Sequence, residues 1–360
     1  MDIAFKAAVE DARVEKNEIG GMLIVDRVYN QQEMFENWYP AAHLKMSTAV
    51  CGKMLSGGGS VGLCLNHACY AIMLGIVDVV VVAAVNRETQ VTASEHLAYS
   101  SRVFDCEFET IHGVTVAGVD GGMSTQRYLF DYKVPQELIA EIPVKCRLHA
   151  SMNPIARFQA PLVTVDDVMG SKLIADPCHL LECASRDDGA AVIVLANEER
   201  TKRGPHPPIW IKGLGEWHEA ASFISDNLTE LPAMRLASQK ALQMAGVGVK
   251  DISLFELYTP FAVMEALAIE ELGLAPRGQG AYLVRDKMTH FDGPHPINVS
   301  GGLLSRGHPV YATQLYNIIE VIIQLRNQAG ARQVKDAKLG LTTGVHSAAN
   351  GVYAAVFERA

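Results

Sequence analysis

The chain has 360 residues, 49% of them hydrophobic, which is enough for one large domain or two ordinary ones with buried cores. Its formal net charge of −9 argues against a nucleic-acid-binding surface, so an anionic ligand would have to meet a local basic patch or helix N-termini. Neither a signal peptide nor a membrane helix is expected, because the N-terminal stretch mixes charges of both signs and the longest apolar run, "VDVVVVAAV", is short.

The seven cysteines are an odd number and form no C-x-x-C pair. This pattern favours free thiols in a reducing cytoplasm over a disulfide scaffold, and it predicts no zinc site. Two histidines in "HFDGPHP", His290 and His295, are expected to be loop residues without a metal. We therefore expect a cytoplasmic protein that contacts neither nucleic acid nor membrane.

In the first half of the chain, helices and strands are expected to alternate. The stretch "AFKAAVEDARVEKNEIGGMLIVD" from Ala4 predicts an Ala-rich helix, a turn and an apolar strand. A Gly-rich turn, "SGGGS", then precedes the helix "VGLCLNHACYAIML" and the buried strand "VDVVVVAAV". Residues of about 100–165 have a mixed composition that suits helices and loops covering a ligand. The stretch "GPHPP" at 204–208 is the expected linker to the second half.

The second half repeats the first. From Ala237, "ASQKALQMAGVGVKDISLFELYT" matches the first stretch at a constant offset, with Ala8 opposite Ala241, Ala12 opposite Ala245 and Ile19 opposite Ile252. A second Gly-rich turn, "SGGLLSRGHPVYA", precedes the helix "TQLYNIIEVIIQLRN" and two apolar segments. We predict an α/β fold of two duplicated halves, residues 1–203 and 209–360, whose Gly-rich turns lie at helix N-termini and face one cleft.

A histidine lies between a glycine and a proline in the second turn. Proline fixes φ and glycine allows close approach, so Gly307-His308-Pro309 predicts a rigid loop that presents one imidazole to a site. The alternative is a helix N-terminus with Pro309 in its first turn and His308 beside it by chance.

Three stretches resemble thiolases. "SGGLLSRGHPVYATQL" resembles their SGG-x-x-x-x-GHP-x-x-A loop, and "IADPCHLLECASRDDGAAVIVLANEER" resembles their ADP…DGAAA segment. "HASMNPIARFQAPLVTVDDVMGSKLIADP" resembles the covering loop of the sterol-carrier-protein type of thiolase. The resemblance implies two thiolase-type halves with a covering loop region, a homodimer, and a site for a coenzyme A thioester substrate with no bound cofactor.

The sequence departs from the family at its catalytic positions. Gly58 lies where thiolases carry the nucleophilic cysteine, and the turn that carries a family histidine reads "LFELYTPF", which places Phe255 there and Tyr258 three residues on. His346 lies in the last catalytic segment but is shifted, so that only His308 matches residue for residue. Thiolases also begin with an apolar strand before the first Ala-rich helix, whereas this chain starts inside that helix.

Without a thiolate at residue 58, an acyl-enzyme of the thiolase type cannot form there. What remains can stabilise a thioester enolate: His308 as acid, base or oxygen donor, Tyr258 and His346 as further proton carriers, and the two Gly-rich turns as substrate-binding donors. The residues of these turns are Gly58, Gly59, Ser300, Gly301 and Gly302.

An enolate can be reached by retro-aldol cleavage of a β-hydroxyacyl-CoA. The steroid side-chain retro-aldolases are similar in this respect, with a GGG turn in place of the cysteine and a histidine at the place of His67, although they carry tyrosines where thiolases have two histidines. The resemblance implies an acyl-CoA lyase or acyltransferase of lipid metabolism, with steroid degradation as the closest parallel, and a small OB-fold, zinc-ribbon partner protein.

Two other functions stay open. The chain fits a non-catalytic, acyl-CoA-binding scaffold subunit of a thiolase-type complex, or an acyltransferase with an unorthodox nucleophile such as Ser60. Cys64 and Cys69 are expected to be small buried hydrophobic residues, and His67 a hydrogen-bonded core histidine. Tyr258 also fits a half-buried tyrosine at a strand end.

Overall fold

The computed structural model describes the chain except for residues 28–38, 220–226 and 347–348. Its first sheet has the strand order β2-β1-β3-β6. The elements of this half are α1 (Asp2–Ala12), β1 (Gly21–Arg27), α2 (Tyr39–His43), β2 (Val50–Lys53), α3 (Ser60–Met73), β3 (Val79–Arg87) and β6 (Asp188–Ala196). Strands β1, β2 and β3 are parallel, and β6 runs antiparallel to β3.

The second sheet has the order β7-β10-β9-β8, in which β10 is antiparallel to both neighbours and β8 is parallel to β9. The elements of this half are β7 (Ile209–His218), α9 (Pro232–Ala245), β8 (Leu254–Glu256), α10 (Ala262–Glu271), α11 (Gly280–Arg285), α12 (Thr313–Leu325), β9 (Leu339–His346) and β10 (Gly351–Arg359). Residues 204–208 connect the short helix α8 (Glu198–Lys202) to β7, between the two sheets in chain order.

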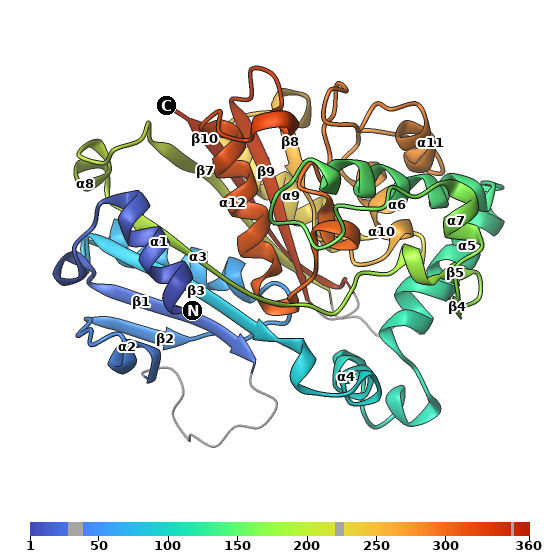
Figure 1. The fold of residues 1–360 in the computed structure, drawn as a ribbon, viewed down its shortest axis with the longest axis horizontal. Helices are drawn as coiled ribbons and strands as arrows, with labels where there is room; N and C mark the ends of the chain where they lie inside the picture. The colour runs from blue at the N-terminus through green and yellow to red at the C-terminus, as the bar shows by residue number, and fades with distance from the viewer. Residues whose placement is uncertain (28–38, 220–226, 347–348) are drawn as a thin grey trace.

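The segment between β3 and β6 forms no part of either sheet and lies to one side of them (Figure 1). Its α-helices and its small hairpin are α4 (Ala93–Ser100), α5 (Ser124–Tyr132), α6 (Gln136–Ser151), α7 (Val165–Met169), β4 (Leu173–Ala175) and β5 (Cys178–His179). Helix α6 packs on α10 and α11, which anchors the segment to the second half.

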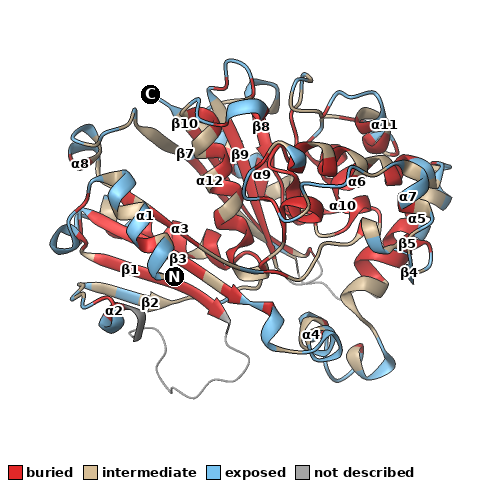
Figure 2. Ribbon diagram, viewed as in Figure 1, coloured by how far each residue is buried: buried red, intermediate tan, exposed pale blue. Residues whose placement is uncertain are grey.

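Helices α3 and α12 lie between the sheets, because each contacts strands of both. Helix α1 covers the outer face of the first sheet and α9 that of the second. The structure explains why the sequence of β3 is continuously apolar. Val80 and Val82 enter the central core, whereas Val79 and Val81 enter the outer core under α1, so both faces of the strand are buried (Figure 2).

The duplicated α/β architecture is confirmed, with α1 and β1 equivalent to α9 and β8. One detail is wrong. The first Gly-rich turn leads directly into α3, but the second, at 300–302, leads into a one-turn helix (Gly302–Arg306), and α12 begins only at Thr313. The reason is local, because Pro309 follows the positive-φ residue Gly307 and separates the two helices.

Candidate active site

A cavity of about 570 Å³ lies at the carboxyl ends of β3, β8 and β9, where ligands of α/β sheets usually bind. Its lining residues include Gly58, His96, Tyr258, His308 and His346. The remaining wall is largely apolar and comes in good part from the segment between β3 and β6. Its apolar members include Leu97, Val103, Val116, Ile174, Leu180, Phe261 and Met264.

The loop that carries His308 is held at its backbone. Gly307 has φ 121°, and a Cβ there would lie 3.2 Å from Asp187 Oδ2, so only glycine fits without strain. The same Asp187 oxygen accepts the backbone N–H of His308 at 2.8 Å. On the ring, Nδ1 lies 2.9 Å from Thr313 Oγ1. Burial lowers the pKa of His308 to about 4, so the imidazole is neutral at pH 7.

Tyr258 is packed against both Gly58 and His308. Its hydroxyl lies 3.5 Å from His308 Nε2 and 3.4 Å from the carbonyl oxygen of Val310, and the two rings meet edge to face with centroids 5.3 Å apart. A Cβ at Gly58 would overlap Cζ and Oη of Tyr258 and lie 2.6 Å from the carbonyl oxygen of Val345. The phenol therefore occupies the space that a side chain at residue 58 would need. Burial raises the pKa of Tyr258 well above its usual value, which keeps the hydroxyl protonated.

The placement of Phe255 at the family's histidine position is wrong in the structure. Phe255 lies within β8 and is fully buried in the core beneath α9 and α10. The strand ends at Glu256, and the chain then turns towards α10, so that Tyr258 is the residue that reaches the cavity.

His346, at the end of β9, lies in the cavity wall and belongs to a chain of polar groups. Its Nε2 lies 2.6 Å from His218 Nδ1, and His218 Nε2 lies 2.9 Å from Glu216 Oε1. A carboxylate only accepts, so His218 Nε2 carries a proton that it donates to Glu216. Burial lowers the pKa of His346 to about 4.

The sequence analysis missed a carboxylate–imidazole pair. Glu88 follows β3, is fully buried, and forms an ion pair with His96 Nδ1 while accepting a hydrogen bond from the Asn86 side chain. Helix α4, which presents His96, begins with a capping box between Thr92 and Glu95. His96 lies in the cavity wall, and Glu88 raises the pKa of His308 electrostatically against the dominant effect of burial. The feature of the sequence that could have indicated this pair is an acidic residue directly after a buried strand.

The two Gly-rich turns differ in their relation to the cavity. Gly58 lines it together with Gly57, whereas Gly59, Ser300, Gly301 and Gly302 are not among its lining residues. The hydroxyl of Ser300 donates to Glu256 Oε2 at 2.7 Å and accepts from Arg306 at 3.1 Å. This buried network fixes the loop that leads to His308.

The cysteines differ in whether they reach the cavity. Burial raises the pKa of Cys64 to about 12 and that of Cys69 to about 11, and neither thiol lines the cavity. Cys183 does line it, and its Sγ lies 3.5 Å from that of Cys178. Ser60, the other suggested nucleophile, is held at its hydroxyl by Ser56 and Gly57 within the turn.

Two arginines, Arg102 and Arg186, lie in the cavity wall and supply local positive charge in a protein of net negative charge. Among the described residues, no group of three His, Cys, Asp or Glu side chains is arranged to hold a metal. None of the described helices combines the length and apolar character that crossing a bilayer requires. His67 is exposed on α3, so its placement as a core histidine is wrong.

The chain is similar to known proteins over nearly its whole length. A family model described as "Thiolase C-terminal domain-like" matches residues 213–359. The acetyl-CoA acetyltransferase of Methanothermobacter thermautotrophicus is 31% identical over 98% of this chain and 92% of its own. The steroid side-chain-cleaving aldolase of Thermomonospora curvata is 27% identical over 85% of this chain and 80% of its own.

Solved structures share the fold. One titled "Ltp2-ChsH2(DUF35) aldolase" superposes with a TM-score of 0.86 at 23% identity, covering 99% of this chain and 91% of that one. A monomeric SCP2-thiolase-like protein from Mycobacterium smegmatis gives a TM-score of 0.75 at 19% identity, over 98% of this chain and 72% of that one. These two likenesses concern the arrangement of helices and strands.

Proposed function

This chain belongs to the thiolase superfamily, and from that premise we propose that it cleaves a carbon–carbon bond of a β-hydroxyacyl-CoA through a thioester enolate, without a cysteine acyl-enzyme. The observation that carries the proposal is the packing of Tyr258 over Gly58. A side chain at residue 58 has no room while the phenol is there. The site therefore offers proton donors and acceptors where a thiolase would offer a nucleophile.

The retro-aldol step needs one base and one donor. Neutral His308 takes the proton of the β-hydroxyl, the bond between the α and β carbons breaks, and its electron pair moves into the thioester carbonyl to give the enolate. The protonated Tyr258 donates to the enolate oxygen, a role its raised pKa suits. The imidazolium of His308 then returns its proton to the α carbon, so the reaction is redox-neutral and releases a ketone or aldehyde and a shortened acyl-CoA.

His96 and His346 are assigned supporting roles. The buried carboxylate of Glu88 holds the His96 imidazole by its Nδ1, and its negative charge partly compensates a transient positive charge on His308. His346, at the carboxyl end of β9, lies next to His218 and is a second proton acceptor in the cavity wall.

The substrate and the partners are proposed from the apolar cavity wall and from similarity to individual relatives. The apolar wall suits a bulky hydrocarbon acyl group, and the T. curvata relative named as a steroid side-chain-cleaving aldolase supports a steroid-type chain. The structure titled with ChsH2(DUF35) supports a second protein that accompanies this chain, for which we propose the small OB-fold, zinc-ribbon type. A homodimer also remains a proposal.

The test is turnover of a synthetic β-hydroxyacyl-CoA with a tertiary alcohol, followed by mass spectrometry of both fragments. Tyr258→Phe should lower kcat by about a hundredfold, because one oxyanion donor is lost, while coenzyme A binding is retained. If the parent binds coenzyme A but cleaves no such substrate in the presence of its partner, the non-catalytic scaffold replaces this proposal. Coenzyme A-dependent thiolysis would instead favour the acyltransferase.

A further inference from the structure

We propose that Cys183 and Cys178 form a reversible disulfide in the wall of the cavity that contains Tyr258 and His308, with hydrogen peroxide or an alkyl hydroperoxide as the oxidant. Cys183 is the thiol that meets the oxidant, and Cys178 is the thiol that resolves the oxidised sulfur. The modification is a property of the folded chain and does not depend on the proposed function, whereas its effect on turnover does.

The two sulfur atoms already lie close together. Sγ of Cys178 lies 3.5 Å from Sγ of Cys183, and the carbonyl oxygen of His179 lies 3.7 Å from the first sulfur and 3.4 Å from the second. Both cysteines are free thiols in the structure. A disulfide bond brings its sulfur atoms to about 2.0 Å, so this pair has to approach by only about 1.5 Å.

The backbone between the two cysteines forms an ordered turn. Cys178 belongs to β5, which pairs with β4, and Cys183 follows the one-turn helix Leu180–Glu182. The backbone N–H of His179 donates to the side chain of Glu182 at 2.6 Å, which closes this turn. Because the turn is already closed, forming the bond restricts little further chain.

The two thiols differ in access to the cavity. Cys183 is partly buried and lines the cavity, whereas Cys178 is 2% exposed and is not among the lining residues. A small oxidant in the cavity therefore meets Cys183 first. The hydrogen bond with Cys183 and burial raise the pKa of Cys178, so Cys178 stays protonated and can donate to the sulfur of Cys183.

The chemistry proceeds in two steps. The thiolate of Cys183 attacks one oxygen of the peroxide, the O–O bond breaks, and Cys183 becomes a sulfenic acid while the other oxygen leaves as water. The sulfur of Cys178 then attacks the sulfur of Cys183, and the hydroxyl of the sulfenic acid leaves as a second water. Two thiols are oxidised to one disulfide, and one hydrogen peroxide is reduced to two waters.

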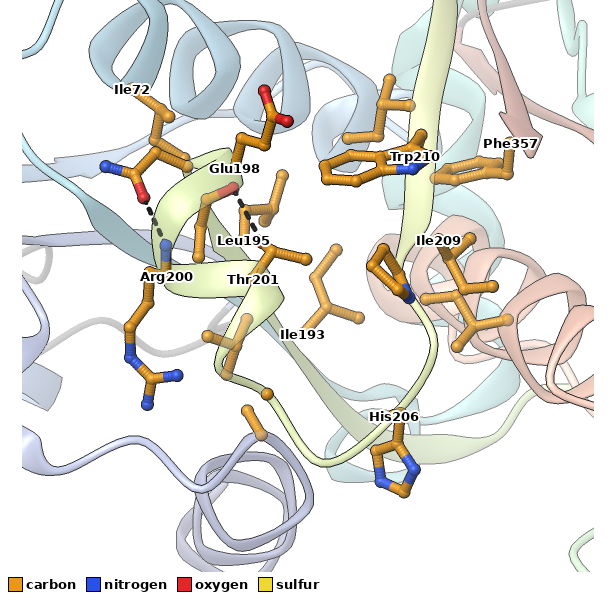
Figure 3. A pocket seen from close by; sticks show the side chains of 18 of the residues that line it. Ile72, Ile193, Leu195, Glu198, Arg200, Thr201, His206, Ile209, Trp210 and Phe357 are labelled. Carbon is orange, nitrogen blue, oxygen red and sulfur yellow. Dashed lines mark hydrogen bonds between the residues drawn. The ribbon is translucent and has the colours of Figure 1, made fainter. Parts of the chain in front are cut away.

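A second pair of cysteines with the same spacing provides an internal comparison. Cys64 and Cys69 also lie five residues apart, but on helix α3, where five residues make about 1.4 turns and direct the two side chains to different sides. Cys69 lines the groove of about 490 Å³ between β6 and β7 that Figure 3 shows. Burial raises the pKa of Cys64 to about 12 and that of Cys69 to about 11. This pair should therefore stay reduced, although one of its thiols also lines a cavity.

The disulfide would affect the site through the backbone that follows Cys178. Cys183 forms an antiparallel bridge with Phe261, and the N–H of Ala184 donates to the carbonyl oxygen of Pro260 at 2.8 Å. Pro260 is two residues from Tyr258, the proposed donor to the enolate oxygen. A misplacement of about 1 Å can cost about a hundredfold in rate, so we expect the disulfide form to turn over substrate at least about tenfold more slowly.

The test is peptide mass spectrometry of the folded chain after treatment with hydrogen peroxide, with the remaining thiols alkylated by iodoacetamide in denaturant. Trypsin releases residues 173–186, "LIADPCHLLECASR", as one peptide that contains both cysteines. We expect this peptide to lose two hydrogen atoms, to take up no iodoacetamide, and to regain both thiols after dithiothreitol. Residues 54–87, the tryptic peptide with Cys64 and Cys69, should keep two alkylated thiols.

Two variants separate the roles of the thiols. In Cys178→Ser the sulfenic acid on Cys183 has no resolving thiol and should be trapped by dimedone, whereas in Cys183→Ser the buried Cys178 should take up none. Circular dichroism and melting curves verify that both variants fold. The proposal is overturned if peptide 173–186 keeps both thiols at a peroxide concentration that oxidises the exposed Cys106, or if Cys178 is trapped as readily as Cys183.

Turnover is measured on the same samples before and after oxidation. A fall of at least about tenfold that dithiothreitol reverses is the expected result, and unchanged turnover of the disulfide form would overturn the coupling to Tyr258. A chain that forms the disulfide but is inactive in its reduced form would contradict the proposed function and not the modification site.

Discussion

The packing of Tyr258 against Gly58 can be measured as a coupling free energy. Gly58→Ala places a methyl group on Cζ and Oη of the tyrosine and within 2.6 Å of the Val345 carbonyl oxygen, an overpacking that should cost about 1–3 kcal/mol of unfolding free energy. Tyr258→Ala removes a ring that is 4% exposed and should cost about 3–5 kcal/mol. In the double variant the overlap with the phenol is gone and only the 2.6 Å approach to the Val345 carbonyl oxygen remains, so part of the cost of the methyl group should disappear.

The double variant should therefore be less destabilised than the sum of the single ones, by about 1 kcal/mol, measured by urea denaturation. Gly52→Ala is the matched control. Its Cβ would meet Leu23 at 3.5 Å, an ordinary contact away from Tyr258, and its cycle with Tyr258→Ala should show no coupling. If Gly58→Ala and Tyr258→Ala are additive, the phenol does not occupy the space of residue 58, and the reasoning fails.

The remaining predictions concern the charged and titrating groups of the cavity. His308→Ala should lower turnover at least about a hundredfold with little change in melting temperature, and His308→Asn should be equally slow if the imidazole moves a proton but faster if it only donates to oxygen. Burial holds the pKa of His308 near 4, so kcat should stay level as pH falls from 7.5 to 5.5, and a decline with an apparent pKa near 6.5 would contradict this. Glu88→Gln removes the charge behind His96 and should shift the acid limb of the kcat profile to lower pH, because the carboxylate raises the pKa of His308; an unmoved limb would exclude that coupling.

Local patterns were sufficient for the architecture and for one site residue. The Val-rich run of β3 and the repeat of Ala8 by Ala241 predicted a duplicated α/β fold, and Gly307 and Pro309 predicted a constrained His308. These features depend on periodicity and backbone geometry, which a single sequence carries.

Contacts between segments that are distant along the chain could not be predicted from the sequence. Glu88 and His96 lie on different elements, and their pairing depends on how α4 returns towards β3. The error at Phe255 is one of register, because the sequence does not say where β8 ends and hence which side chain reaches the cavity. The conflict between Tyr258 and a side chain at residue 58 likewise exists only in three dimensions.

Product analysis during turnover tests the central claim most directly. A β-hydroxyacyl-CoA is incubated with the enzyme in the absence of free coenzyme A, and both the small-molecule products and the intact protein mass are recorded. We predict equal amounts of a carbonyl fragment and a shortened acyl-CoA, with no acyl group on the protein. Dependence on free coenzyme A, together with a stoichiometric acyl adduct on Cys183 in the cavity wall, would contradict the account.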